Sequence, residues 1–376
     1  MKFRSERDSF ADVLSTAGRA ASGRGGASAV LSGLMLHAEG NRLEVTGTDL
    51  DLTIRVEHEV IGVEDGTCVI PARLTADVVR ALEAGAVTLE SDDDKVEISS
   101  ARAHFGLRSF PAVEFPALPP PPEPSATLPR GALSEALRQV VRAASGDDAR
   151  PLLTGVLMTT EGDAVRLVAT DSYRLALRDL SGKVTFGEGA DVLVPARALG
   201  ELQRLSSSST AVSETTDSPG TEVGVAASTS EITFTTGRVR ISTRLLEGTY
   251  PDYRQLIPEQ YPNRLHVGRE SLLAALRRVR LLVRDSATPV RLSMRSGGVD
   301  LSVVSQEVGD ASETVDGDFT GEDLVIAFNP SYLIDGVDAV LDDEVFVETD
   351  NPARPATVRA AGRDDFRYLL MPVRVS

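Results

Sequence analysis

Three structural elements recur in the same order along this chain of 376 residues. The first is an amphipathic helix with apolar residues at helical spacing, and its copies cover 9–19, 132–142 and 271–280. The second is a half-buried strand that ends in a polar turn, at 43–56 and 165–179, with a divergent copy from 299. The third is a strand that runs into a helix, at 69–85, 193–205 and 326–341.

The length of the repeat indicates that each copy is a domain. Equivalent residues such as Pro71 and Pro195 are roughly 120–135 positions apart, whereas solenoid repeats have periods of about 20–50 residues. Two helices and several short strands per copy favour the α+β class. A proline-rich linker at 116–124 and a joint at 250–258 separate the copies. We therefore expect three domains of one topology, at 1–125, 126–258 and 259–376.

Local sequence signals place helix starts and one loop. Proline is tolerated at the beginning of a helix because the first N–H groups have no partner there. Pro71, Pro195 and Pro330, the last preceded by Asn329, therefore mark helix starts. The Ser/Thr-rich segment 206–220 is expected to form a loop.

Composition excludes several classes of protein. The single cysteine, Cys68, rules out an internal disulfide and a cysteine metal site. No apolar run approaches the roughly 20 residues of a membrane span, and the charged start MKFRSERDSF predicts no signal peptide. We expect a cytoplasmic protein. The net charge is −17, from 39 basic and 56 acidic residues, so any nucleic-acid contact needs an uneven distribution of charge.

No catalytic set emerges from the sequence. The four histidines lack the helical spacing of metal ligands and are interpreted as structural: His37, His58, His104 and His266. Asp49 and Asp51 would share a face of a strand as a paired-carboxylate hydrolase site. The alternative is a turn aspartate that accepts backbone amides, favoured because Asp171 repeats the position without a second carboxylate. We expect no enzyme, no metal and no cofactor.

Arginines recur on one face of equivalent helices, although the protein is acidic. Residues at i, i+3, i+4 and i+7 share a helix face, and this spacing relates Arg73 to Arg80, Arg138 to Arg142, Arg197 to Arg204, and Arg277 to Arg280 and Arg284. A repeated basic face favours contact with the phosphate backbone of nucleic acid without reading of bases. A plain solvated face remains the alternative.

Five segments resemble the bacterial DNA sliding clamp family, the beta subunit of DNA polymerase III, and are similar to its actinobacterial members. They are Met1-Lys2-Phe3 with Glu6-Arg7, then 170–176, 245–258, 327–332 and 368–374. The resemblance implies three clamp domains per chain and a head-to-tail homodimer ring of six domains around double-stranded DNA. It implies a non-catalytic processivity factor near the nucleoid and an antibiotic target.

The resemblance also implies three sets of site residues. A cleft between domains two and three would dock peptides of the replicative polymerase, clamp loader and repair proteins. Arg174 and Arg374 would form its polar rim. The cleft comprises Leu153, Thr170, Ser172, Tyr173, Arg174, Leu175, Pro251, Leu256, Leu369, Leu370, Met371, Pro372, Val373 and Arg374. The DNA-facing set is the nine arginines above together with Arg24. The dimer interface would include Phe105, Leu107, Leu281 and Leu282.

Departures from the family pattern leave two alternatives. A Gly-rich loop covers 23–28, Asp147-Asp148 would weaken a phosphate contact, and Ser172-Tyr173 line the cleft. These changes favour a paralogous clamp whose altered cleft resists peptide inhibitors. A scaffold that docks peptides but not DNA is the other alternative.

Overall fold

The first helix of each repeat forms within two residues of its predicted position. Because two of these helices end early, Arg142 and Arg280 lie in 3-10 turns and Arg284 lies outside any helix, so the predicted helical stripes are wrong at these three residues. The computed structural model describes residues 1–22, 28–92, 94–182, 184, 186, 191–207, 221–258, 261–284 and 288–374. In it the first helices are α1 (Arg7–Ala17), α3 (Arg130–Val140) and α5 (Arg269–Val279). The second helices are α2 (Ala72–Ala81), α4 (Ala196–Ser207) and α6 (Pro330–Ala339).

The predicted helix starts are confirmed. Pro71 is the N-cap of α2 and Pro330 is the first residue of α6. The side chain of Asn329 accepts hydrogen bonds from Ser331 N and Tyr332 N at 2.9 and 3.2 Å, which satisfies two of the free N–H groups at this helix end. Of the predicted loop 206–220, the first two residues complete α4 and 208–220 lie outside the described residues.

An arginine joins the two helices of each repeat. The first residue of each first helix donates from its guanidinium to a carbonyl in the last turn of the second helix. These bonds join Arg7 to Arg80, Arg130 to Leu205 and Arg269 to Asp338, at 3.3, 3.1 and 3.0 Å. Because the last carbonyls of a helix have no partner within the helix, a cation there is doubly favourable. The repeat therefore extends from the order of elements to individual contacts.

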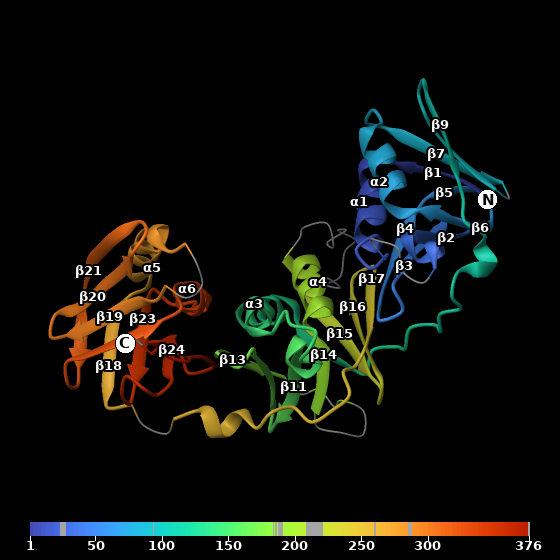
Figure 1. Ribbon diagram of the computed structural model, residues 1–376. Helices are drawn as coiled ribbons and strands as arrows, with labels where there is room; N and C mark the ends of the chain where they lie inside the picture. Colours follow the sequence, from blue (N-terminus) through green and yellow to red (C-terminus); the bar gives the residue numbers. More distant parts are fainter. Residues whose placement is uncertain are drawn as a thin grey trace. The chain divides into compact units, whose positions relative to one another are not determined.

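The chain divides into two compact units, whose elements are labelled in Figure 1. The first contains 1–134, 184–189 and 197–245, and the second contains 135–183, 190–196 and 246–376. Residues of the predicted second domain occur in both units, so the boundaries at 125 and 258 stay predictions. Each unit is built around antiparallel sheets of its own.

The first unit contains two sheets. The five-stranded sheet has the order β5-β1-β7-β8-β9, with bounds Ile61–Glu64, Lys2–Glu6, Ala86–Asp92, Lys95–Ser100 and Ala103–Arg108. The eight-stranded sheet has the order β10-β15-β16-β17-β4-β3-β2-β6. Its strands are Ala126–Pro129, Glu222–Ala227, Glu231–Thr236, Val239–Arg244, Leu52–Glu59, Arg42–Thr48, Gly33–Glu39 and Gly66–Pro71.

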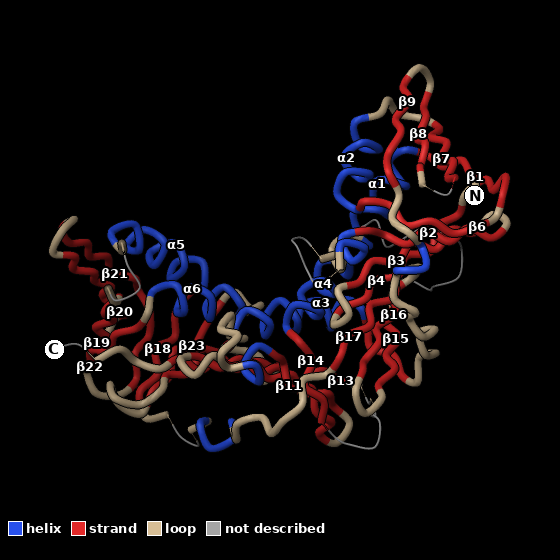
Figure 2. Tube along the Cα trace, turned by 45° about the vertical axis from the view of Figure 1, so that its right-hand side comes forward, coloured by secondary structure: helices blue, strands red, loops and turns tan. Residues whose placement is uncertain are grey.

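The second unit contains one twelve-stranded sheet, of order β14-β11-β12-β13-β25-β24-β23-β18-β21-β20-β19-β22. Its strands are Asp191–Pro195, Gly155–Glu161, Ala164–Thr170, Arg174–Ser181, Phe366–Leu370, Ala356–Ala360, Glu344–Thr349, Asn263–Gly268, Gly309–Thr320, Gly298–Ser305, Val290–Arg295 and Leu324–Phe328. Helices α5 and α6 pack together on one face of it (Figure 2). The divergent third copy of the strand element is the hairpin β20–β21.

Both large sheets run through a joint between repeats. In the first unit β4 pairs with β17, with Leu52 opposite Thr243. In the second unit β13 pairs with β25, with Arg174 opposite Leu370. In each pair, a strand that follows a Thr-Asp turn joins a strand of the next repeat. The joints are therefore made of backbone hydrogen bonds as well as side-chain packing.

Short 3-10 helices and one proline-rich linker connect these elements. The 3-10 helices described are η1 (Ala29–Ser32), η2 (Ala112–Glu114), η3 (Val141–Ala143), η4 (Pro151–Thr154), η6 (Tyr253–Leu256) and η7 (Arg280–Leu282). The predicted linker 116–124 has no regular secondary structure, and Arg55 donates to its Pro119 carbonyl at 2.7 Å. None of the helices described is long and apolar enough to cross a membrane.

Cys68 on β6 is expected to be chemically inert in the folded protein. Its side chain is 6% exposed, and burial raises the pKa of the thiol to about 11, so little thiolate exists at pH 8. We predict that a disulfide reagent labels Cys68 about 100-fold more slowly in the native protein than in guanidinium. The variant Val113→Cys, which adds a thiol at an exposed site, is the control and should label at once. Fast native labelling of Cys68 would contradict the burial of β6.

Candidate functional site

The turn at Thr170–Arg174 positions the candidate site. Thr170 Oγ1 accepts a hydrogen bond from Ser172 N at 3.1 Å. Asp171 Oδ1 accepts from Tyr173 N and Arg174 N at 2.9 and 3.0 Å. Ser172 has φ of 80°, in the left-handed region that side chains rarely adopt. The Thr and Asp side chains therefore hold a strained backbone in a fixed shape.

The same turn occurs in the first repeat, where it decides between the two interpretations of Asp49 and Asp51, a paired-carboxylate site and a turn aspartate. Asp49 Oδ1 accepts from the backbone N–H groups of Asp51 and Leu52 at 3.1 and 2.9 Å, and Leu50 has φ of 82°. Asp49 also pairs with Arg197 of α4. The hypothesis of a paired-carboxylate hydrolase site is therefore wrong, because the Asp49 carboxylate is occupied by the turn. The alternative of a turn aspartate is confirmed.

An apolar cluster lies behind the turn and gives the predicted cleft a hydrophobic floor. It comprises Leu157, Val168, Leu175, Leu177, Leu193, Tyr253 and Leu369, with Leu152, Leu246, Tyr250 and Ile257 packed against it. Of the predicted cleft residues, Leu153, Thr170, Leu175, Leu369 and Leu370 are buried. They support the surface rather than present themselves to a ligand.

The exposed part of the predicted cleft comes from three segments of the second unit. Tyr173 and Met371 are 59% and 43% exposed, and Leu256 and Val373 are exposed as well. Met371 N donates to the carbonyl of Tyr173 at 2.8 Å, so the C-terminal segment lies against the turn. An exposed tyrosine beside an exposed methionine provides an adaptable apolar surface.

The C-terminal segment also lines a cavity of about 810 Å³ that sequence reasoning missed. Val373 N donates to the carbonyl of Ala327 at 2.8 Å, which seats this segment along the edge strand β22. The cavity is lined by Arg291, Val325, Ile326, Ala327, Pro352, Ala353, Met371, Pro372, Val373 and Arg374. The sequence signals are the segments 327–332 and 368–374, both of which carry the family resemblance; the second supplies the predicted cleft residues Met371, Pro372, Val373 and Arg374.

Arg174 does not form a polar rim, so that expectation is wrong. Its side chain is 11% exposed and lies in ion pairs with Asp171 at 3.0 Å and Asp335 at 2.5 Å. Its guanidinium also lies 4.3 Å from the ring centre of Tyr332 on α6. Burial alone would lower the pKa of Arg174, but Tyr368, Asp335 and Asp171 outweigh it and raise the pKa. Arg174 therefore fastens β13 to α6. Arg374 is exposed and its role stays a prediction.

Arg150 is a residue of the candidate site that the sequence did not predict. Its Nη1 donates to Ser172 Oγ at 3.2 Å and to the Asp171 carbonyl at 3.3 Å. Its Nε donates to Asp147 at 3.1 Å. The acidic pair at 147–148, expected to repel phosphate, thus has one member already compensated. Arg150 braces the strained turn from outside.

The predicted DNA-facing arginines differ in exposure and in partners. Side chains of Arg73, Arg80, Arg197, Arg204 and Arg277 are more than half exposed, and Arg280 and Arg284 are exposed too. Carboxylates within ion-pair distance lie beside Arg73, Arg80, Arg138, Arg142, Arg197, Arg204 and Arg277. Arg24, and all of the Gly-rich loop except Ser28, lie outside the described residues.

The predicted dimer residues lie at the surface of both units. Phe105 and Leu107 belong to β9, an edge strand of the five-stranded sheet, and Phe105 is exposed. Leu281 of η7 is 77% exposed, and Leu282 beside it is half-buried. Large apolar side chains at a free strand edge and a helix end are typical of an association surface. Their role in a dimer stays a prediction.

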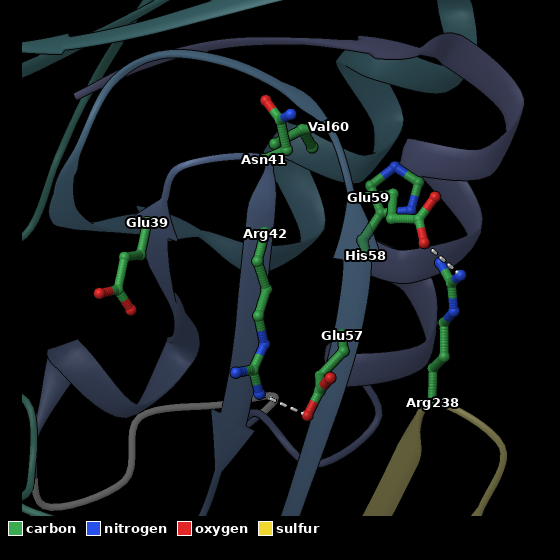
Figure 3. A pocket seen from close by; sticks show the side chains of 8 residues that line it. All are labelled: Glu39, Asn41, Arg42, Glu57, His58, Glu59, Val60 and Arg238. Carbon is green, nitrogen blue, oxygen red and sulfur yellow. Dashed lines mark hydrogen bonds and ion pairs between the residues drawn. The ribbon is translucent and has the colours of Figure 1, made fainter.

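A second pocket, of about 580 Å³, lies in the first unit and shows no reactive group (Figure 3). Arg42 pairs with Glu57 at 2.6 Å, and Arg238 pairs with Glu59 at 2.6 Å. His58 Nε2 lies 2.7 Å from Ser5 Oγ, and burial lowers the pKa of this histidine. Both arginines that line the pocket are thus paired with glutamates of the same pocket, which Glu39 lines as well. No cluster of three metal-binding side chains occurs in the described part of the chain.

Comparisons with known proteins agree along the whole chain. Models of the N-terminal, central and C-terminal domains of the DNA polymerase III beta subunit match residues 1–119, 127–252 and 254–374. The beta sliding clamp of Streptomyces coelicolor is 36% identical, with all of both chains covered. A beta sliding clamp homolog, GriR, from Streptomyces muensis is 32% identical and covers 100% of this chain and 99% of its own.

A solved structure adds agreement in fold. The sliding clamp of Bartonella birtlesii bound to griselimycin is 29% identical and superposes with a TM-score of 0.91, with 100% of both chains covered. The expected fold of three clamp domains is therefore confirmed.

The network around Arg174 should carry measurable stability. We predict that Arg174→Ala lowers the free energy of unfolding by about 3–5 kcal/mol, because it leaves the buried carboxylate of Asp171 without a cation. The control Arg254→Ala removes an exposed arginine paired with Glu161 and should cost less than about 1 kcal/mol. Guanidinium denaturation followed by circular dichroism measures both. Equal effects of the two variants would contradict the fastening role of Arg174.

The triple match of domain models and the full-length identity to curated clamps place this chain in the DNA polymerase III beta subunit family, the bacterial beta sliding clamps.

Proposed function

We propose that this chain is a sliding clamp, in which two copies pair head to tail into a ring that encircles double-stranded DNA and tethers the replicative polymerase. The observation that carries the proposal is the match of three beta-subunit domain models in order along one chain. Members of this family are non-catalytic. A ring holds DNA by topology, so the contacts inside it need little affinity and permit sliding. The ring works in the cytoplasm, at the nucleoid.

The DNA-facing surface consists of the arginines on the repeated helices, with Arg24 from the Gly-rich loop. Seven of the nine arginines, which lie on the helices or shortly after them, have exposed side chains that phosphate oxygens can approach from solvent. Guanidinium groups bind phosphate through a planar fork of donors and read no base sequence. The same contact then serves any duplex that the ring encloses.

The docking surface for partner peptides is the cleft around Tyr173 and Met371, over the apolar floor described above. A short, loosely hydrophobic segment of polymerase, clamp loader or repair protein binds there. Leu256 and Val373 are further exposed apolar side chains of the predicted cleft. The cavity next to β22 continues it toward Arg374 and provides room for a second side chain of the peptide.

The two copies meet through Phe105 and Leu107 of one chain and Leu281 and Leu282 of the other. Burial of exposed Phe105 and Leu281 supplies apolar area, at about 25 cal/mol per Å². The domain boundaries at 125 and 258 lie close to the ends of the matched models.

A second candidate function is a paralogous clamp that withstands peptide inhibitors at its cleft. A relative at 32% identity is named a clamp homolog, GriR, and a similar clamp was solved with griselimycin bound. The cleft of this chain presents Tyr173, 59% exposed, on a strained turn. Griselimycin binding in the micromolar range or weaker, with normal binding of partner peptides, supports this candidate. Equal tight binding of both would rule it out.

Peptide docking can be tested by fluorescence polarisation with a labelled peptide of the Gln-Leu-x-Leu-Phe type. We predict saturable binding that Met371→Ala weakens about tenfold, since truncation of an apolar contact costs about 1–2 kcal/mol. The control Val304→Ala shortens an exposed apolar side chain on β20 and should leave the affinity unchanged. Wild-type affinity in Met371→Ala would place docking elsewhere.

DNA contact can be tested by charge reversal. We predict that changing Arg277, Arg280 and Arg284 together to Glu weakens binding to a short duplex more than tenfold at low salt. The salt dependence of binding should become shallower by about two phosphate contacts, those of Arg280 and Arg284. The control changes Arg102, Arg295 and Arg354 to Glu, which alters net charge equally outside the repeated helices. Unchanged binding by the first variant favours the peptide-docking scaffold instead. Fluorescence anisotropy over a salt series measures both.

A further inference from the structure

One position of the repeat changes the sign of its charge. The ninth residue of the second helix is Arg80 in α2 and Arg204 in α4, but Asp338 in α6. Arg80 and Arg204 are both more than half exposed and belong to the proposed DNA-facing set. The third repeat therefore places a carboxylate where the other two place a guanidinium.

Four arginines surround the Asp338 carboxylate within the second unit. Two come from the first helix of the second repeat and the 3-10 turn after it, and two come from α5. The closest distances are 3.1 Å for Arg142, 3.3 Å for Arg277, 3.7 Å for Arg269 and 3.9 Å for Arg138. The Asp338 carboxylate is therefore a shared ion-pair partner of all four arginines.

The four arginines depend on Asp338 to different degrees. Arg142 has a second carboxylate at 3.9 Å, Asp335, and Arg269 also pairs with Glu270. Within the described residues, Asp338 is the only carboxylate within 4.0 Å of Arg138 and of Arg277. Loss of the Asp338 charge would therefore leave these two guanidinium groups without an ion-pair partner.

Both of these arginines can reach solvent. The side chain of Arg277 is 57% exposed and that of Arg138 is 34% exposed. Burial lowers the pKa of Arg138, and repulsion from Arg142 and Arg269 lowers it further, although Asp338 and Glu135 oppose this. A phosphate group is an anion whose oxygens can accept paired hydrogen bonds from two guanidinium groups.

We propose that the Asp338 carboxylate competes with DNA phosphate for Arg138 and Arg277. Because it pairs with both guanidinium groups, it lowers the affinity of the ring for the duplex. This inference rests on the proposed function, in which these helices face DNA. A ring that slides gains from weak contacts, and each neutralised phosphate steepens the salt dependence of binding by about 0.9. Asp338 removes such contacts from Arg138 of the second repeat and Arg277 of the third, while it leaves both arginines in place.

A purely structural role makes a different prediction. If Asp338 only joins α6 to the arginines of neighbouring helices, loss of its charge lowers the thermal stability and leaves DNA affinity unchanged. The salt dependence of DNA binding separates the two roles, because a structural ion pair does not alter the number of phosphates contacted.

The test compares Asp338→Asn with the wild-type protein on a short fluorescent duplex over about 50–200 mM salt. We expect at least fivefold tighter binding at the low end and a salt slope steeper by about one to two contacts. Asp338→Glu keeps the charge and should stay within twofold of wild type. Asp323→Asn is the matched control, since it removes one exposed negative charge outside the cluster. Mass photometry and thermal melts verify the assembly and folding of each variant.

Two outcomes separate failure of this inference from failure of the proposed function. If Arg280→Ala weakens DNA binding but a folded Asp338→Asn binds as wild type or more weakly, the competitor role is overturned and the DNA-facing surface stands. If Arg280→Ala also has no effect, both are overturned. Should Asp338→Asn fail to fold, Asp338→Ser removes the same charge with a smaller side chain and carries the same expectation.

Discussion

Backbone pairing across the joints between repeats is the constraint on which the rest of the molecule depends. The β4–β17 and β13–β25 ladders make each joint part of a continuous sheet. Their hydrogen bonds satisfy strand edges that would otherwise be open to other chains. Because β13 is fixed to β25, the turn before β13 and the segment after β25 necessarily lie together. The candidate cleft is a consequence of that register.

Ion pairs also link neighbouring repeats at both joints. At the first joint the turn aspartate Asp49 pairs with Arg197 of the next repeat, and at the second joint Arg174 links its own turn to Asp335 of α6. The same turn thus makes contact with the second helix of the following repeat in both cases, through different partners. Arginine suits this use because its planar fork binds two acceptors at once.

Local patterns in the sequence predict the helices, the helix starts and the Thr-Asp turn. These features depend on neighbours within a few residues, as the Asn329 cap and the amides held by Asp171 illustrate. Features that depend on distant residues could not be predicted. From the sequence, Arg174 is predicted to be an exposed rim residue. Only the fold brings it into an ion pair with Asp335, which lies far along the chain. Likewise Arg138 and Arg277 read as separate stripes, and only the fold brings both to Asp338.

The left-handed residue of the repeated turn has a consequence for how such proteins diverge. The Thr and Asp that precede the residue at positive φ set the shape of the turn. That residue is Leu50 in one copy and Ser172 in the other. The backbone thus tolerates unlike side chains there at a similar cost in strain. Mutation at this position can alter the chemistry of the rim without disturbing the sheet beneath it, so partner preference can evolve separately from the architecture.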